Sequence, residues 1–126
     1  MRVYKLKAFA RFQRRERIAD VLLAKAVRDA GRGLRDTDLG GGLIKQRVAR
    51  PGAGKRGGYR TVIAYRRGER AVFLYGFAKS TRANVDDDEL EVLRRRGMGL
   101  LNAPEAALEA MIADDALIEV SYDEEE

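Results

Sequence analysis

Apolar residues recur along the first third of the chain with two different spacings. Residues 1–6 have the pattern of a short strand, and Phe9 and Phe12 then stand three apart, as on one side of a helix. A second helix is predicted to begin with Asp20 as its N-cap and to end at residues 31–33, which include two glycines. Its apolar stripe comprises Ile18, Leu22, Ala26 and Ala30, widened by Leu23 and Val27.

Three runs of strand-forming residues follow a Gly-Gly-Gly segment. The runs cover residues 43–49, 59–65 and 71–78. In the first run, Ile44 and Val48 alternate with Lys45 and Arg47, so the apolar and the basic side chains point to opposite faces. Residues 66–69 supply a hairpin turn, and the third run is apolar on both faces, as expected of a central strand. The runs predict an antiparallel sheet.

Helix-capping patterns mark the C-terminal third of the chain. Asp86 and Glu89 have the spacing of a capping box, and Asn102 and Glu105 repeat this spacing before a shorter helix. The final residues, 117–126, alternate apolar with polar and acidic side chains, which fits either an edge strand or a docking tail.

These elements predict one α+β domain over residues 1–126. We expect two N-terminal helices packed on a twisted antiparallel sheet, followed by C-terminal helices and an acidic tail at residues 116–126. Neither an internal repeat nor a linker interrupts the pattern.

Composition narrows the chemistry that is available to the chain. It has no cysteine and no histidine, so it lacks a thiolate nucleophile and the imidazole groups that most often bind transition metals. We expect no cofactor and no metal. No apolar run approaches the ~20 residues that span a bilayer, and basic residues interrupt any N-terminal signal segment. The expectation is a cytoplasmic protein that does not bind membranes.

The two ends of the chain carry opposite charge. Residues 1–82 hold 22 Lys and Arg against 6 Asp and Glu, a net +16, whereas residues 83–126 hold 3 against 14, a net −11. One interpretation is that these are two solvated faces of one globule. The other is a basic body that binds a polyanion, with nucleic acid as the first hypothesis.

Cations on the predicted sheet are the candidate catalytic groups. They are Lys45, Arg47, Arg60 and Lys79. On an antiparallel sheet they can converge to hold a scissile phosphate and to stabilise the negative charge that develops during its cleavage. The alternative is an exposed strand face with ordinary charges.

The glycine-rich loop at residues 50–58 supplies candidate RNA-binding groups. Lys55 and Arg56 lie between glycines and can reach RNA phosphates, although the loop is also suited to be a simple connection. It lacks the first glycine and the Ser or Thr of a phosphate-binding P-loop, so nucleotide hydrolysis is not expected. Tyr59, beside the loop, is the candidate for base stacking, and Arg82 is a further candidate RNA contact.

The order of elements and the segment GGLIKQRVARPGAGKRGGYRTVIAYRRGERAVFLYGFAKS, residues 41–80, resemble the RelE/ParE superfamily of type II toxins. The segment looks like a RelE/HigB-like subgroup, in which a Lys-x-Arg strand leads into a Gly-Lys-Arg-Gly-Gly-x-Arg loop and strand. A hydrophobic strand ending in Ala-Lys-Ser or Asp-Lys follows. The resemblance covers about residues 2–100.

This resemblance implies an mRNA interferase, a toxin that cleaves mRNA in the ribosomal A site. The ribose 2′-hydroxyl attacks the adjacent phosphate, and no metal is needed. The implied partners are mRNA, the ribosome and a cognate antitoxin of the helix-turn-helix type. Basic catalytic residues of the family correspond to Lys45, Arg47, Arg60 and Lys79, with Lys55 and Arg56 in the loop. Tyr122 is the only tyrosine near the C-terminus, where relatives often have a tyrosine or histidine.

Two other functions stay open at this point. The ParE branch has the same fold but inhibits DNA gyrase by binding, without cleaving RNA, and a chain without histidine fits that role. A basic nucleic-acid-binding module without toxicity is the third possibility.

Overall fold

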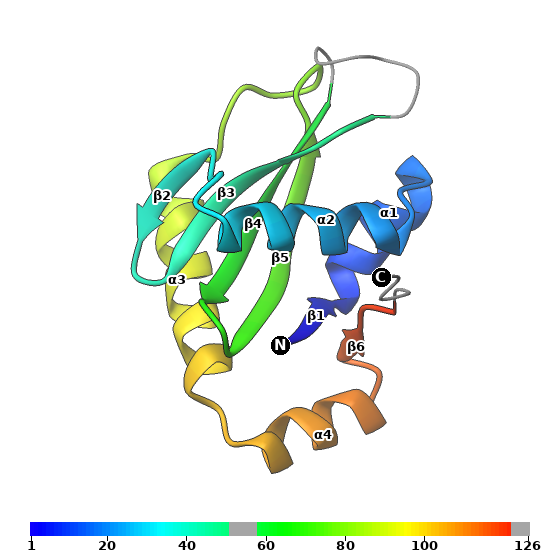
Figure 1. Cartoon of the computed structure of the whole chain (residues 1–126), viewed down its shortest axis with the longest axis vertical. Coiled ribbons are helices and arrows are strands. Elements are labelled where there is room, and N and C mark those ends of the chain that lie inside the picture. Colours follow the sequence, from blue (N-terminus) through cyan, green and yellow to red (C-terminus); the bar gives the residue numbers. More distant parts are fainter. Residues whose placement is uncertain (51–57, 122–126) are drawn as a thin grey trace.

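A sheet of six strands runs through the middle of the described part of the molecule (Figure 1). The structure is a computed structural model that describes residues 1–50 and 58–121. Its elements are β1 (Arg2–Leu6), α1 (Lys7–Glu16), α2 (Asp20–Gly31), β2 (Thr37–Gly40), β3 (Leu43–Val48), β4 (Tyr59–Arg66), β5 (Arg70–Ala78), α3 (Asp87–Asn102), α4 (Glu105–Ala113) and β6 (Leu117–Glu119). The strand order is β2-β3-β4-β5-β1-β6, and neighbouring strands are antiparallel except for the parallel pair β1 and β5. The expected α+β fold is confirmed.

Helices cover both faces of the sheet, so the molecule has two hydrophobic cores. Figure 1 shows α2 lying across one face, on which α1 also packs, while α3 lies on the other. The first core joins α1 and α2 to the sheet through side chains such as Phe9, Leu23 and Phe73. The second joins α3 and α4 to the opposite face through Val62, Leu100 and others. The central strands are therefore apolar on both sides, as predicted for residues 71–78.

Two of the three predicted helix caps are wrong. Asp86 does begin α3 with a capping box, in which its Oδ1 accepts from the Glu89 amide at 2.8 Å. The N-cap of α2, however, is Ala19, and Asp20 is the first residue of the helix. Pro104 precedes α4, whereas Asn102 ends α3.

Tertiary contacts recruit the side chains that were expected to cap these helices. Asp20 accepts hydrogen bonds from Lys5 Nζ at 2.9 Å and from Gln13 Nε2 at 2.6 Å. Burial alone would raise the pKa of the Asp20 carboxyl, but these hydrogen bonds outweigh burial and lower it below the ordinary value. Asn102 Oδ1 accepts from Arg66 Nη2 at 3.0 Å. Both side chains therefore join separate elements instead of closing a helix end.

The C-terminal segment forms an edge strand, which decides between the two predicted alternatives. Strand β6 pairs antiparallel with β1, placing Ile118 opposite Lys5. Arg2 binds this edge to α4, because its guanidinium donates to Glu119 at 2.9 and 3.0 Å and to Glu109 at 3.0 Å. The expected acidic tail at 116–126 thus includes a strand of the sheet, and residues 122–126 lie outside the described residues.

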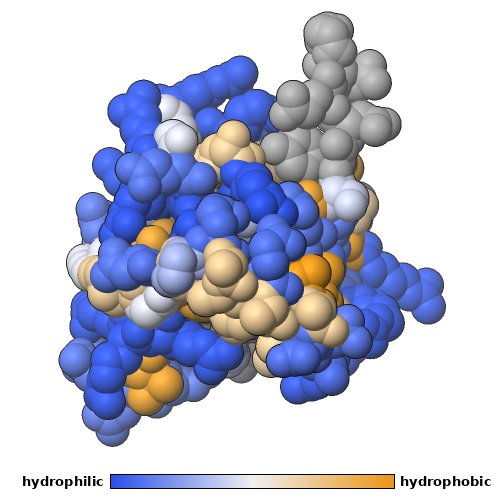
Figure 2. All heavy atoms as spheres, turned by 90° about the horizontal axis from the view of Figure 1, so that it is seen from below, coloured by the Kyte–Doolittle hydropathy of each residue, from blue (hydrophilic) through white to orange (hydrophobic). Residues whose placement is uncertain are grey.

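The face of the molecule seen from below is mainly hydrophilic, with apolar residues across its middle (Figure 2). Exposed large apolar side chains within the described ranges are Met1, Val21, Leu34, Val92 and Met98. None of the helices in these ranges is long and apolar enough to cross a membrane.

Close packing of α3 on the sheet depends on the absence of a side chain at Gly97. A Cβ atom there would lie 2.8 Å from Leu43 Cδ1 and 3.1 Å from Ala64 Cβ. At Gly99, two residues further along the same helix, a Cβ would meet no atom within 4 Å. A comparison of alanine substitutions at these two glycines therefore separates the effect of helix propensity from that of packing.

We expect Gly97→Ala to be less stable than Gly99→Ala by about 1–3 kcal/mol, the usual cost of overpacking a core. Both substitutions gain about 1 kcal/mol of helix propensity, so their difference isolates the steric effect. Urea denaturation followed by circular dichroism measures both. Equal stabilities would show that α3 does not pack as closely on Leu43 and Ala64 as described.

Candidate nucleic-acid interface

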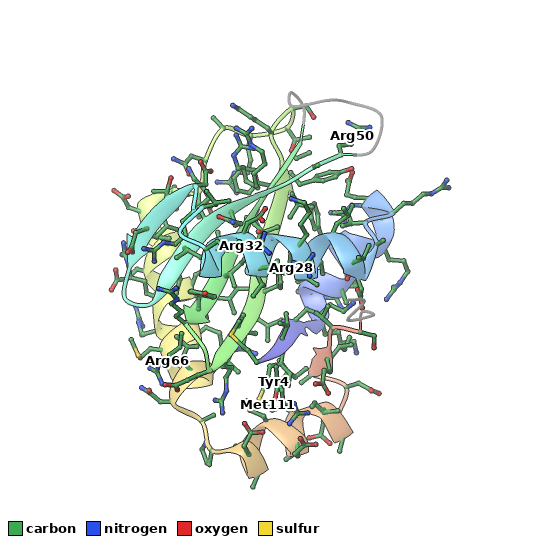
Figure 3. All side chains as sticks on the ribbon, in the orientation of Figure 1. Tyr4, Arg28, Arg32, Arg50, Arg66 and Met111 are labelled. Atoms are coloured by element: carbon green, nitrogen blue, oxygen red, sulfur yellow. The ribbon has the colours of Figure 1, made fainter. Side chains whose placement is uncertain are left out.

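Basic side chains gather on the α3 side of the sheet, beyond the part that α3 covers. Arg47 on β3 lies directly opposite Arg60 on β4, and Arg60 in turn lies opposite Phe77 on β5. Lys45 is two residues from Arg47 and therefore on the same face. Side chains with terminal nitrogen atoms are grouped near the upper ends of β3, β4 and β5 in Figure 3. We use the name cationic face for Lys45, Arg47 and Arg60 on this surface together with Lys79 and Arg82, which follow β5 in the chain.

Arg60 is the buried member of the cationic face. Its side chain is only 9% exposed, and its Nε lies 3.4 Å from Asp36 Oδ2. Asp36 immediately precedes β2, so the Arg60 side chain reaches across β3 to meet it. Two arginines directly opposite each other on neighbouring strands repel, and Asp36 offsets part of that repulsion. The sequence pattern places Arg60 on this face but does not predict its burial or its partner.

Three other cations of this face carry charge that no described residue neutralises. Arg47 and Lys79 are exposed and Lys45 is half-buried. None of them forms an ion pair within residues 1–50 and 58–121. Lys45 Nζ lies 3.5 Å from Asn84 Oδ1, a neutral acceptor. This part of the sheet can therefore bind an anion without first breaking an ion pair.

Arg82, by contrast, is held firmly by its neighbours. Its guanidinium donates to Glu89 Oε1 at 2.6 Å and Oε2 at 3.1 Å, and to the Tyr75 hydroxyl at 2.9 Å. It also lies over the rings of Tyr75 and Phe77, with its central carbon 5.9 and 5.7 Å from the two ring centroids. Glu89 thus has two roles, as the residue that completes the capping box of Asp86 and as the partner of Arg82, and only the first is evident in the sequence.

Tyr59, the candidate for base stacking, lies in the hydrophobic core. It is 2% exposed and packs edge-on against Phe12, with ring centroids 5.7 Å apart. Its hydroxyl lies 3.2 Å from Glu16 Oε1, and burial, together with this carboxylate, raises the pKa of the hydroxyl. A ring placed in this way is not accessible to a nucleobase. Lys55 and Arg56 lie outside the described residues.

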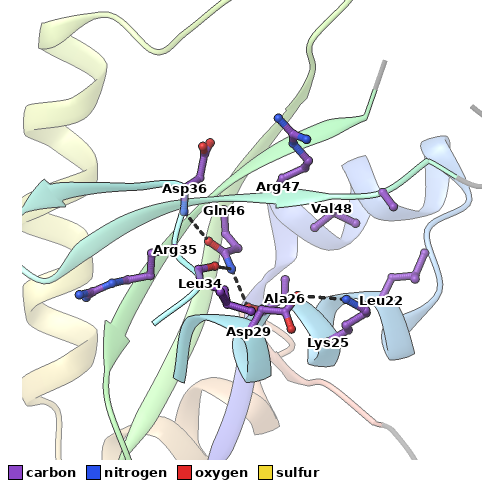
Figure 4. A pocket seen from close by; sticks show the side chains of 11 residues that line it. Leu22, Lys25, Ala26, Asp29, Leu34, Arg35, Asp36, Gln46, Arg47 and Val48 are labelled. Carbon is purple, nitrogen blue, oxygen red and sulfur yellow. Dashed lines mark hydrogen bonds and ion pairs between the residues drawn. The ribbon is translucent and has the colours of Figure 1, made fainter. Parts of the chain in front are cut away.

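A cavity of about 460 Å³ between α2 and β3 shows how Asp36 is held in place (Figure 4). The buried amide of Gln46 projects toward α2 and donates from Nε2 to the carbonyl groups of Ala26 and Leu34, each at 3.0 Å. Its Oε1 accepts from the Asp36 amide at 3.0 Å. The segment that carries Asp36 is thereby attached to α2, and Asp36 is positioned for Arg60.

The pair formed by Arg82 and Glu89 makes a testable electrostatic prediction. Hydrogen bonds from Arg82 and from the Asp86 amide lower the pKa of Glu89 from 4.5 to about 2. Because the pKa is lower in the folded state, the ionised carboxylate stabilises the fold above about pH 4.5, and this contribution is lost as the pH falls toward 2.

Arg82→Gln should raise the pKa of Glu89 toward 4.5, because the strongest hydrogen-bond donor to the carboxylate is removed. An NMR titration of the carboxyl carbon measures the change. Arg95→Gln is the control: Arg95 is exposed on α3, the helix that carries Glu89, and its replacement should leave the pKa of Glu89 unchanged. An unchanged Glu89 pKa in the Arg82 variant would contradict this pairing in solution.

Comparison with models of protein families gives a match. A family model described as the RelE toxin of the RelE / RelB toxin-antitoxin system matches residues 1–120. These residues include every helix and strand from β1 to β6. No curated protein matches the chain.

Proposed function

The chain belongs to the RelE toxin family, and we propose that it is a cytoplasmic mRNA interferase that cleaves mRNA on the ribosome. The observation that carries this proposal is the set of cations Lys45 and Arg47 on β3 and Lys79 just after β5, none of which forms an ion pair within the described residues. Basic side chains that lack acidic partners repel one another. A protein that displays several of them together is suited to bind a polyanion.

In the proposed reaction, the ribose 2′-hydroxyl gives up its proton to water as its oxygen forms a bond to the adjacent phosphorus, and the bond from phosphorus to the 5′-oxygen breaks. Negative charge accumulates on the phosphoryl oxygens in the transition state. Arg47 presents two donors to these oxygens, whereas Lys45 and Lys79 act as point charges. Arg60 lies opposite Arg47 on the neighbouring strand and its side chain is largely buried, so it contributes a fixed positive field and holds the local geometry. The Lys45 ammonium is our candidate for protonating the departing 5′-oxygen.

We further propose that the toxin is neutralised by a cognate antitoxin, of the helix-turn-helix type, encoded by an adjacent gene. Lys55 and Arg56 are proposed to bind RNA phosphates beside the cleavage site. The alternative function, inhibition of DNA gyrase in the manner of the ParE branch, uses the same fold and predicts no loss of mRNA.

Adding the protein to a cell-free translation system tests the proposal. Primer extension should show new 5′ ends within translated codons, and expression of the chain alone should arrest growth. Intact mRNA together with inhibited DNA supercoiling would instead support the gyrase inhibitor.

Arg47→Ala and Lys79→Ala should each slow cleavage by roughly 10²–10³-fold, because each removes a fixed cation from a site where negative charge develops. Their melting temperatures should stay near that of the wild type, since both side chains are exposed. Arg28→Ala is the matched control: Arg28 is also exposed, but lies on α2, on the opposite side of the sheet (Figure 3).

Arg60→Ala should differ from these variants by losing stability as well as activity, because it leaves Asp36 without its cationic partner. Full activity in both the Arg47 and the Lys79 variants would place the catalytic site elsewhere.

A further inference from the structure

A small depression adjoins the cationic face, between β5 and the first half of α3. Its volume is about 240 Å³, and it is lined by Tyr75, Glu89, Val92 and Leu93. Tyr75 and Leu93 are half-buried, whereas Val92 is 61% exposed. We call this depression the base pocket.

The walls of the base pocket are apolar and are suited to a flat ring. Tyr75 contributes an aromatic side chain, and Val92 and Leu93 contribute aliphatic groups. Val92 is conspicuous because the neighbouring exposed positions of α3, Asp88 and Glu91, are charged. Aromatic and aliphatic side chains that remain accessible beside a basic surface are the usual partners of unstacked nucleobases.

Glu89 supplies the one charged polar group of the pocket, and it retains a capacity to accept hydrogen bonds. Its Oε1 already accepts from Arg82 at 2.6 Å and from the Asp86 amide at 3.1 Å. Its Oε2 accepts from Arg82 Nη1 alone, at 3.1 Å, among the described residues. A carboxylate oxygen has two lone pairs, so Oε2 can accept a further N–H donor. The low pKa of Glu89, about 2, keeps this acceptor ionised at neutral pH.

The strand register places the base pocket within reach of a nucleotide bound to the cationic face. Tyr75 lies opposite Val62, and Val62 lies opposite Lys45. Strands are about 4.8 Å apart, so the backbones at Tyr75 and Lys45 are separated by about 10 Å. A nucleotide can extend over such a distance with its phosphate at the lysine and its base toward the tyrosine.

We propose that the base pocket binds a nucleobase next to the scissile phosphate and prefers a base with an exocyclic amino group. The proposal rests on the proposed RNA-cleaving function and adds its specificity determinant. An amino group of cytosine, adenine or guanine donates to the carboxylate of Glu89, as cytosine N4 does to acidic side chains elsewhere. Uracil presents a single N–H between two carbonyl oxygens, which a carboxylate repels.

Binding of a short RNA that carries 2′-O-methyl groups, and so cannot be cleaved, tests the pocket independently of catalysis. Fluorescence anisotropy compares oligonucleotides that are identical except for cytosine, uracil or an abasic residue at one position, with that position moved along the strand. At one position the full chain should bind the cytosine form roughly 5- to 100-fold more tightly than the abasic form, the range expected of base stacking. Uracil should lie between them.

Val92→Gln should reduce this difference several-fold, because it replaces an apolar wall by a longer polar side chain. Met98→Gln is the matched control: Met98 is 39% exposed on the same helix but does not line the pocket, so its variant should bind like the wild type. Circular dichroism of both variants checks that α3 is intact.

The outcomes separate the two proposals. Equal binding of cytosine and abasic forms at every position by the wild type would overturn the base pocket, even if mRNA is cleaved. A retained preference in Val92→Gln would also overturn it. A base preference that is lost in Val92→Gln but is not accompanied by any mRNA cleavage would support the pocket and contradict the interferase.

Discussion

The register of β3 against β4 determines which side chains the candidate site contains. Ile44 pairs with Ile63 and enters the core beneath α1 and α2, while Arg47 pairs with Arg60 and points to the opposite face. Because side chains alternate along a strand, a shift of one residue would exchange the two faces. Arginines would then enter the apolar core and isoleucines would leave it. The hydrophobic cores therefore fix the face of the sheet on which these cations lie.

The cationic face is an unfavourable arrangement in electrostatic terms, and its supports lie on several elements. Arg47 and Arg60 are like charges on directly opposite residues, and Asp36 is the carboxylate paired with Arg60. Asp36 is in turn positioned by Gln46, whose amide joins it to α2 on the other side of the sheet. A helix that presents no residue of the site thus contributes to its geometry. Such indirect support is typical of sites in which a fixed charge must be held before the ligand arrives.

The start of α3 borders the cationic face on the side away from Asp36. Glu89 closes the capping box with Asp86 and binds Arg82, so the loop that leaves β5 and the first turn of α3 are joined by one carboxylate. This arrangement neutralises Arg82 and leaves Lys45, Arg47 and Lys79 as the accessible charges. It also forms one wall of the base pocket, which places an apolar surface about 10 Å from Lys45, one of the cations proposed to bind phosphate. Phosphate and base could then be contacted by groups on a single rigid scaffold.

The sequence by itself determined most of the secondary structure, because local signals suffice for it, although strand β2 and the N-caps of α2 and α4 were not predicted. The alternation around Lys45 and Arg47 gave the strand and its faces, and Asp86 with Glu89 gave the start of α3. The same alternation put Lys45, Arg47 and Arg60 on one surface, and the motifs in the sequence identified the family that the match over residues 1–120 supports.

Only the tertiary structure decided which of these side chains are accessible, since burial depends on elements that are distant in the chain. Tyr59 is enclosed by Phe12 and Glu16, which precede it by more than 40 residues. Asp20 does not cap α2 but accepts a hydrogen bond from Lys5. The C-terminal segment forms a strand because it pairs with the edge of β1. The pairing of Arg60 with Asp36 likewise crosses a strand that lies between them. Local sequence patterns do not predict such contacts, because the residues that form a hydrogen bond or an ion pair are brought together only when the helices and the sheet pack.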